Sequence, residues 1–151
     1  MNIFLDDRRC RENLYPFTQT RHVADIRVGI LTIREKWELL AEKKIITSVA
    51  ELEGGELPIH ADIIPTLQNF QSVMRTSGEK ISILENNEIK ILHHPWQIFQ
   101  YNDWAIRHDF ALVTEGKISQ PISATNRCIN EQQIFIEEGA EVEHCIINAA
   151  T

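Results

Sequence analysis

Residues 14–37, LYPFTQTRHVADIRVGILTIREKW, constrain the fold more than any other stretch of this chain. The stretch opens at residues 15–18 with a proline turn flanked by aromatic side chains. Apolar side chains then recur at i, i+3, i+7 and i+10, which predicts one helix face made of Ile30, Ile33, Trp37 and Leu40. Gly29 precedes this helix, where a glycine serves either close approach of the backbone to a ligand or another chain, or an ordinary turn.

Positive charge gathers in the same part of the chain. Residues 1–36 have a net charge of +2, whereas the remaining residues have −9, and six of the nine arginines precede Lys36. The loop at residues 6–13 holds three of these arginines, and arginine suits phosphate because it can form two parallel hydrogen bonds with its oxygens. This pattern indicates a small anionic ligand. The alternative is a solvated loop in which the arginines pair with Asp6, Asp7 and Glu12.

The overall charge and the cysteine pattern limit the functional classes. A formal charge of −7 argues against broad nucleic-acid binding, which needs a basic domain. No apolar run approaches the roughly 18 residues of a spanning helix, and the opening MNIFLDDRR is no signal peptide, so we expect a cytoplasmic protein without a membrane role. Three scattered cysteines fit reduced thiols. Six histidines are better explained as surface or core residues than as a metal site.

Strands and helices alternate along the rest of the chain. Strands are expected at residues 2–5, 45–50 and 57–64, and a hairpin at residues 80–84 and 88–92. The first strand ends in a polar loop, where α/β proteins place their ligand sites. The run at residues 57–64 carries a single carboxylate, Asp62, near its end.

Two further helices are expected after these strands. Pro65 can open the first, which ends at Gly78 and has an apolar face made of Leu67, Phe70 and Met74. Asn102 is the predicted cap of the second, which ends at Gly116 and is lined on one side by Ile106, Phe110 and Val113. Core or interface packing is expected for Trp96, Phe99, Tyr101 and Trp104.

The periodicity changes after Pro121. Residues 136–141 and 142–147, IEEGAE and VEHCII, each have an aliphatic residue first, an acid second and a small or apolar residue fifth. Hexapeptide repeats of this kind wind a β-helix in which coils bury their faces only against one another, so about two units are too few for an independent solenoid. Either the sequence is a fragment or another subunit covers the coil end; an ordinary strand pair is the alternative.

With both ends in view, the chain resembles a family of bacterial sugar nucleotidyltransferase-like proteins. These are related to N-acetylglucosamine-1-phosphate uridyltransferase and often labelled glucose-1-phosphate thymidylyltransferase. The resemblance is carried by residues 14–37 and by HHPWQIFQYNDWAIRHDF, SQPISATN and IFIEEGAEVEHCIINA. It implies an α/β fold, with a truncated Rossmann-like nucleotidyltransferase domain at residues 1–120 and the first coils of a left-handed hexapeptide β-helix at residues 121–151.

The same resemblance implies a reaction and its site. A sugar 1-phosphate attacks the α-phosphate of a nucleoside triphosphate, with Mg²⁺, and pyrophosphate leaves. Residues 21–23 stand where the family has Pro-Lys, and no glycine precedes Gly29, so the charge for binding phosphate is assigned to Arg11, Arg21 and Arg27. Residues 59–62 are similar to the strand end that holds the metal in this family, which makes Asp62 the candidate Mg²⁺ ligand.

Two classes of function follow from these observations. The first is a sugar-1-phosphate nucleotidyltransferase, active or degenerate, whose partners are a nucleoside triphosphate and a sugar 1-phosphate. The second is a non-catalytic sugar-nucleotide-binding or oligomerisation module whose coils trimerise or dock a partner. A homo-oligomer is expected. An acetyltransferase activity has the least support, because about two coils cannot form the groove between subunits that such enzymes use.

Overall fold

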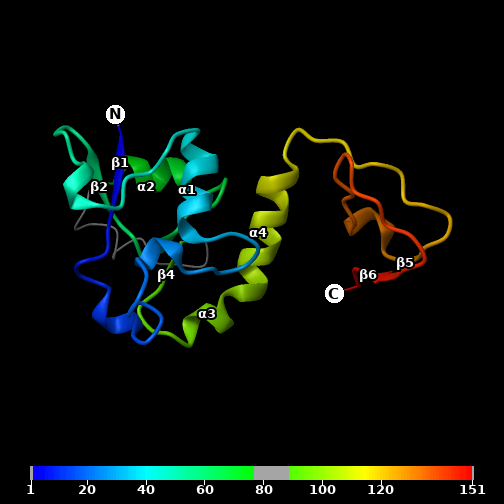
Figure 1. Ribbon diagram of the computed structural model, residues 1–151, viewed down its shortest axis with the longest axis horizontal. Coiled ribbons are helices and arrows are strands. Elements are labelled where there is room, and N and C mark those ends of the chain that lie inside the picture. Colours follow the sequence, from blue (N-terminus) through cyan, green and yellow to red (C-terminus); the bar gives the residue numbers. More distant parts are fainter. Residues whose placement is uncertain (1, 77–88, 151) are drawn as a thin grey trace. The chain divides into compact units, whose positions relative to one another are not determined.

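The computed structural model describes residues 2–76 and 89–150 of this chain. They form two compact units, Met1–Val113 and Thr114–Thr151 (Figure 1). Within the first unit, helices and short strands surround an apolar core whose fully buried side chains include Leu5, Leu14 and Trp37.

The first sheet consists of two parallel strands, β1 (Ile3–Asp6) and β2 (Leu57–His60), which lie side by side in Figure 1. Ile46 extends this sheet on the other side of β1, because its carbonyl accepts the Leu5 N–H at 2.9 Å. The strand expected at residues 45–50 is therefore reduced to one bridge. It stops there because the Ser48 hydroxyl accepts the Ala50 N–H and starts a 3-10 turn at Val49–Glu51.

A second small sheet pairs β3 (Ile63–Ile64) with β4 (Lys90–Ile91) in antiparallel register. The single strand expected at residues 57–64 is thus divided into β2 and β3 by a turn at residues 61–62. One arm of the expected hairpin, residues 80–84, lies outside the described residues. The other arm pairs with β3.

Helix α1 (Ile33–Ala41) is the helix expected from residues 14–37. A capping box fixes its start, since the Thr32 side chain accepts the Glu35 N–H and the Glu35 carboxylate accepts the Thr32 N–H. Ile33 and Trp37 are fully buried, as predicted, but Ile30 is 40% exposed. Including Ile30 in the helix was wrong, because the cap ends the helix before it.

Helix α2 (Phe70–Arg75) begins later than the expected start at Pro65. Thr66 and Asn69 exchange two hydrogen bonds between their side chains and backbones, at 2.8 and 3.2 Å, and so form a turn before the helix. The expected stop at Gly78 lies outside the described residues.

Helix α3 (Gln97–Gln100) leads directly into α4 (Asn102–Thr114). The second expected helix is therefore present, but its inward side differs from the prediction. Ala105 and Asp109 are the buried residues of α4, whereas Ile106 is 41% exposed. The prediction of an apolar inward side was wrong. A carboxylate of α4 lies inside the unit instead, because it has polar partners there, as described below.

The aromatic residues around α3 separate into two groups. Tyr101 and Trp104 pack against the core, in agreement with the prediction. Trp96 and Phe99 are 57% and 74% exposed, so a core role is wrong for these two.

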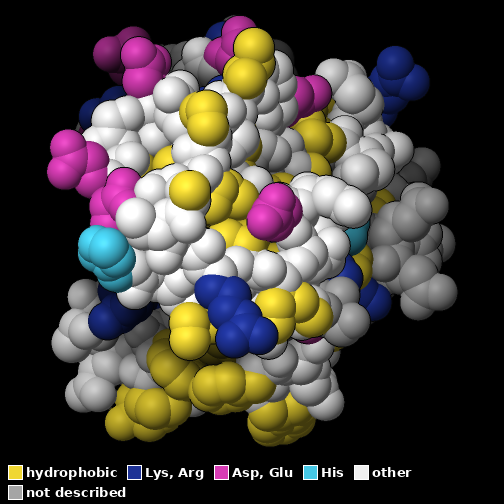
Figure 2. All heavy atoms as spheres, turned by 90° about the vertical axis from the view of Figure 1, so that its right-hand side faces the viewer, with side chains coloured by type: hydrophobic (Ala, Val, Ile, Leu, Met, Phe, Trp, Pro, Cys, Tyr) yellow, Lys and Arg dark blue, Asp and Glu magenta, His cyan; other side chains and the backbone are white. Residues whose placement is uncertain are grey.

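The second unit contains a two-stranded parallel sheet, β5 (Arg127–Ile129) and β6 (Ile146–Asn148). Arg127 pairs with Ile146, an offset of 19 residues, and Asn126 also spans this offset by accepting the Cys145 N–H at 2.9 Å. Ile129 and Ile146 are 47% and 78% exposed. Figure 2 shows hydrophobic side chains exposed across the face that it views.

Among the described residues, no helix has the length and apolar composition required to cross a membrane.

Candidate functional site

Polar side chains gather where the parallel strands β1 and β2 end. The last residues of the two strands, Asp6 and His60, lie opposite one another, and the Ala61 N–H donates to the Asp6 carbonyl at 3.0 Å. Asp7 follows the first strand and Asp62 follows the second. Ligands of open α/β sheets bind outside the carboxyl ends of the strands, so this end of the sheet is the candidate site.

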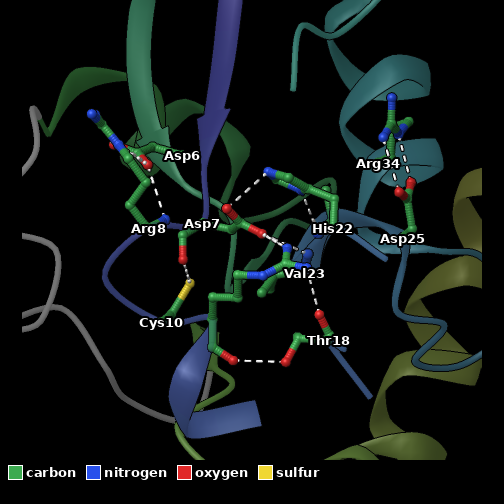
Figure 3. A network of polar contacts seen from close by, with 11 residues as sticks. Asp6, Asp7, Arg8, Cys10, Thr18, His22, Val23, Asp25 and Arg34 are labelled. Atoms are coloured by element: carbon green, nitrogen blue, oxygen red, sulfur yellow. Dashed lines mark hydrogen bonds and ion pairs between the residues drawn. The ribbon is translucent and has the colours of Figure 1, made fainter. Parts of the chain in front are cut away.

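Asp7 holds the loop after β1 against the segment that precedes α1. Its carboxylate accepts a hydrogen bond from Arg11 at 2.7 Å and another from the Val23 N–H at 3.3 Å. Its carbonyl accepts the Arg11 N–H at 2.8 Å, which closes the loop on itself. Figure 3 shows the Asp7 carboxylate pointing toward His22 and Val23. Two segments of the candidate site are thereby fixed relative to each other.

His22 is the neutral partner in this network. Its Nδ1 accepts the Ala24 N–H at 3.1 Å, so the ring proton of the neutral form lies on Nε2, 3.4 Å from an Asp7 carboxylate oxygen. Burial lowers the pKa of His22, although the charge of Asp7 opposes this effect. The site thus presents an uncharged histidine near neutral pH.

Two arginines of the loop pair with the carboxylates beside them. Arg8 contacts Asp6 through two hydrogen bonds of 2.9 and 2.6 Å, and this contact is the main cause of the lowered pKa of Asp6. Arg11 is bound to Asp7 and also donates to the Thr18 carbonyl. For these arginines the alternative of pairing within the loop holds. Their side chains stay 69% and 40% exposed, so each retains accessible surface for an anion.

Asp62 is the least satisfied polar group of the site. Only 6% of the residue is exposed, and its Oδ1 has no hydrogen-bond partner among the described residues. Burial raises the pKa of Asp62, and the neighbouring His60 and His93 counteract the rise. The parts of the chain that the structure describes contain no group of three His, Cys, Asp or Glu side chains placed to hold a metal ion.

Cys10 links Asp62 to the Asp7 network. The thiol is buried, lies 3.5 Å from the Asp7 carbonyl and interacts with Asp62 as well. Burial, followed by the charges of Asp62 and Asp7, raises the pKa of the Cys10 thiol. The raised pKa favours the protonated thiol, which can donate to the Asp7 carbonyl.

The remaining predicted arginines lie apart from this network. Arg27 pairs with Thr32 across a tight hairpin, and its guanidinium donates to the Ile30 carbonyl and lies 3.7 Å from Glu35. Arg21 is exposed and forms no hydrogen bond or ion pair with another described residue. The structure thus brings Arg11 close to Asp7 and Cys10, while Arg27 belongs to a second cluster.

Lys36 and Asp109 form a buried ion pair that was not predicted from the sequence. Both side chains are almost fully buried, with exposures of 0% and 3%, and the ammonium group contacts both carboxylate oxygens. The pKa of Lys36 is lowered by burial, and the adjacent Asp109 carboxylate opposes this shift without cancelling it. One signal was present in the sequence: Lys36 stands three residues after Ile33, on the apolar face of the predicted helix.

Gly29 serves the close approach of two segments of the same chain. Its φ is +85°, and a Cβ at this position would lie 2.5 Å from an Asp109 carboxylate oxygen and 2.9 Å from Ala105. Its N–H donates to the Asn102 side chain at 3.0 Å. The predicted capping role of Asn102 is therefore replaced by a contact with the hairpin.

Comparison with known proteins finds a match to a family over residues 2–118. A family model described as a sugar nucleotidyl transferase matches residues 2–53 and 39–118, a span that contains every site residue named above. No curated protein and no solved structure matches the chain.

Proposed function

Because this chain belongs to the sugar nucleotidyl transferase family, we propose that its first unit transfers a nucleotidyl group from a nucleoside triphosphate to a sugar 1-phosphate and releases pyrophosphate. The observation that carries this proposal is the buried Asp62 carboxylate, whose Oδ1 has no partner among the described residues, next to an arginine-bearing loop. A buried oxygen of this kind is costly unless a ligand satisfies it.

Magnesium fits the chemistry of this carboxylate. Mg²⁺ prefers oxygen ligands and is commonly bound through one or two carboxylates plus the phosphates of a substrate. We propose Asp62 as the protein ligand, since its free oxygen lies at the carboxyl ends of β1 and β2. When bound, the metal neutralises charge on the phosphate oxygens.

Arginines are proposed to bind the phosphates. Arg11 is oriented by Asp7 and by the Thr18 carbonyl yet remains 40% exposed, and Arg27 is 57% exposed. Arg21 is exposed and forms no hydrogen bond or ion pair with another described residue, so its guanidinium is available to an anion. In phosphoryl-type transfer, such positive charge stabilises the charge that develops on the phosphate oxygens.

The second unit is proposed to be the start of a left-handed β-helix within residues 121–151, following a nucleotidyltransferase domain at residues 1–120. Its parallel strands pair at an offset of 19 residues. This offset supports a coiled chain in which each turn pairs with the turn before it. We also propose that the chain forms homo-oligomers, and that it acts in the cytoplasm, where its three free cysteines stay reduced. Light scattering after size-exclusion chromatography tests the oligomer.

A non-catalytic sugar-nucleotide-binding module is the alternative function. It is favoured because hydrogen-bond donors that could otherwise bind a phosphate already have partners within the protein. Asp7 accepts a hydrogen bond from Arg11, and α4 side chains accept hydrogen bonds from the hairpin N–H groups. A binding module would bind a sugar nucleotide but would produce no pyrophosphate.

Pyrophosphate release tests both functions in one experiment. The wild type is incubated with each nucleoside triphosphate, a panel of sugar 1-phosphates and Mg²⁺. Asp62→Ala and Arg21→Ala should abolish or strongly reduce release. Arg107→Ala is the control, since the partner of this exposed arginine among the described residues is Asp103, one helical turn away, and its loss should leave the rate unchanged. A wild type that is inert with every pair yet binds a sugar nucleotide would support the alternative.

A further inference from the structure

Helix α4 holds the hairpin that carries Arg27. Three consecutive backbone N–H groups at the hairpin tip all donate to side chains of α4: Gly29 to Asn102 at 3.0 Å, and Ile30 and Leu31 to Asp109 at 2.8 and 3.1 Å. A run of N–H groups of this kind is a good acceptor site for negative charge. In this chain, the carboxylate that occupies it belongs to the protein itself.

Contact between the hairpin and the helix is also steric. The Asp109 oxygen and the Ala105 backbone and side chain lie so near Gly29 that no Cβ could be placed there. Lys36, from α1, also pairs with Asp109, so the same carboxylate contacts both α1 and the hairpin. The tip of the hairpin is therefore clamped against α4.

The peptide group between Ile30 and Leu31 connects this clamp to Arg27. Its N–H, which is that of Leu31, donates to Asp109 at 3.1 Å, while its carbonyl, which is that of Ile30, accepts a hydrogen bond from the Arg27 guanidinium. Glu35, the other partner of Arg27, is itself fixed by accepting the Thr32 N–H at 2.6 Å. Arg27 is thus oriented by groups that are themselves held, while 57% of its side chain faces solvent.

We infer that Asp109 is a positioning residue for Arg27, which it orients through the peptide group between Ile30 and Leu31 so that the guanidinium can bind a phosphate of the nucleoside triphosphate. This inference rests on the proposed function for the identity of the anion. It accounts for a buried ion pair that stability alone does not explain, because two apolar side chains of similar size commonly stabilise a protein equally well. Apolar side chains could not accept the Ile30 and Leu31 N–H groups.

Two double variants separate this role from that of a counter-ion for Lys36. Lys36→Met with Asp109→Asn removes the ion pair but keeps a side-chain oxygen for the hairpin N–H groups. Lys36→Met with Asp109→Leu removes the ion pair and that oxygen. Neither variant leaves an unpaired charge in the core, so both are expected to fold, and thermal melting verifies this.

The first measurement is the affinity for UTP and dTTP with Mg²⁺, by calorimetry. The asparagine variant should bind like the wild type. The leucine variant and Arg27→Ala should each bind nucleotide about tenfold more weakly, which is the usual effect of losing one charge-assisted hydrogen bond. Adding Arg27→Ala to the leucine variant should cost little more, because both changes remove the same interaction. Equal affinities of the two double variants, or fully additive losses, would overturn the inference.

The second measurement needs no nucleotide. Nitrogen-15 relaxation of the Arg27 Nε–H should show an ordered side chain in the wild type and in the asparagine variant, and a mobile one in the leucine variant. If the wild type binds no nucleoside triphosphate, the proposed function fails, and the role of Asp109 is decided by this signal alone. An equally ordered Arg27 in both double variants would contradict the positioning role.

Discussion

Asp62 combines burial with an unused hydrogen-bonding atom, and this combination should be visible in stability. In the absence of metal and nucleotide, Asp62→Asn should raise the free energy of unfolding by about 1 kcal/mol, because an amide is less costly to bury than an ionised carboxylate. Urea denaturation at neutral pH measures the change. Asp25→Asn is the matched control: this carboxylate pairs with Arg34 at 2.7 and 3.0 Å, so its loss should destabilise the protein. A destabilised Asp62→Asn would contradict the account.

His22 should make the stability of the first unit depend on pH. Burial lowers its pKa, so the folded protein binds the proton less readily than the unfolded chain does. The contribution of His22 to the free energy of unfolding is therefore present above the ordinary histidine pKa of about 6.5. It is lost as the pH falls from there toward the pKa of His22 in the folded protein. His22→Asn can still accept the Ala24 N–H and should weaken this dependence. Identical slopes of unfolding free energy against pH in both proteins would contradict this assignment.

Individual residues differ in how far the sequence could identify them. Asp62 stands out in the sequence because it is the single carboxylate in an apolar run. Asp109 does not, and neither does the contact between Asp7 and Val23, since these partners lie 79 and 16 residues apart along the chain. Charge patterns in the sequence indicate an anionic ligand but do not distinguish an arginine held by a neighbouring carboxylate from one without such a partner.

Among the structural elements, the hairpin between Arg27 and Thr32 depends most on a single residue. Gly29→Ala should destabilise the protein by several kcal/mol, since both its positive φ and its contacts with α4 exclude a Cβ. Gly54→Ala provides the control, because Gly54 also has a positive φ but, its chain neighbours aside, no atom of the described residues lies within 4 Å of the place that its Cβ would occupy. It should cost only about 1 kcal/mol. Thermal melting compares the two, and equal losses would show that contact with α4 is unimportant.

The same hairpin explains why the elements were predicted better than their orientations. Helix α1 and helix α4 are both evident from periodicity, and α1 buries Ile33 and Trp37 as expected. Helix α4 instead buries Asp109, because the hairpin N–H groups and Lys36 together satisfy its carboxylate. Hydrophobic periodicity assumes that the inward side of a helix is apolar, and it fails where a polar group has partners inside.

At the scale of the whole molecule, each of the two units is stabilised internally by a different kind of contact. The first has a continuous apolar core, whereas the described part of the second relies on hydrogen bonds between segments 16 to 20 residues apart. The hexapeptide repeats in the sequence predict stacked coils, which stays a prediction, and they do not indicate which side chains form these hydrogen bonds. A unit with little apolar burial should open more readily than one with a core.

Asn126 provides the sharpest test of this difference. Its side chain donates to the Val142 carbonyl at 2.7 Å and accepts the Cys145 N–H at 2.9 Å, so one amide joins the residue before β5 to the segment before β6. Asn126→Ala should speed amide hydrogen exchange at Arg127 and Cys145 by about tenfold, with no change at the buried amides of β1. Gln132→Ala is the control, because Gln132 is exposed and its side chain forms no described hydrogen bond. Faster exchange in β1 as well would mean that the two units unfold together, since the loss of one contact in the second would then destabilise the core of the first.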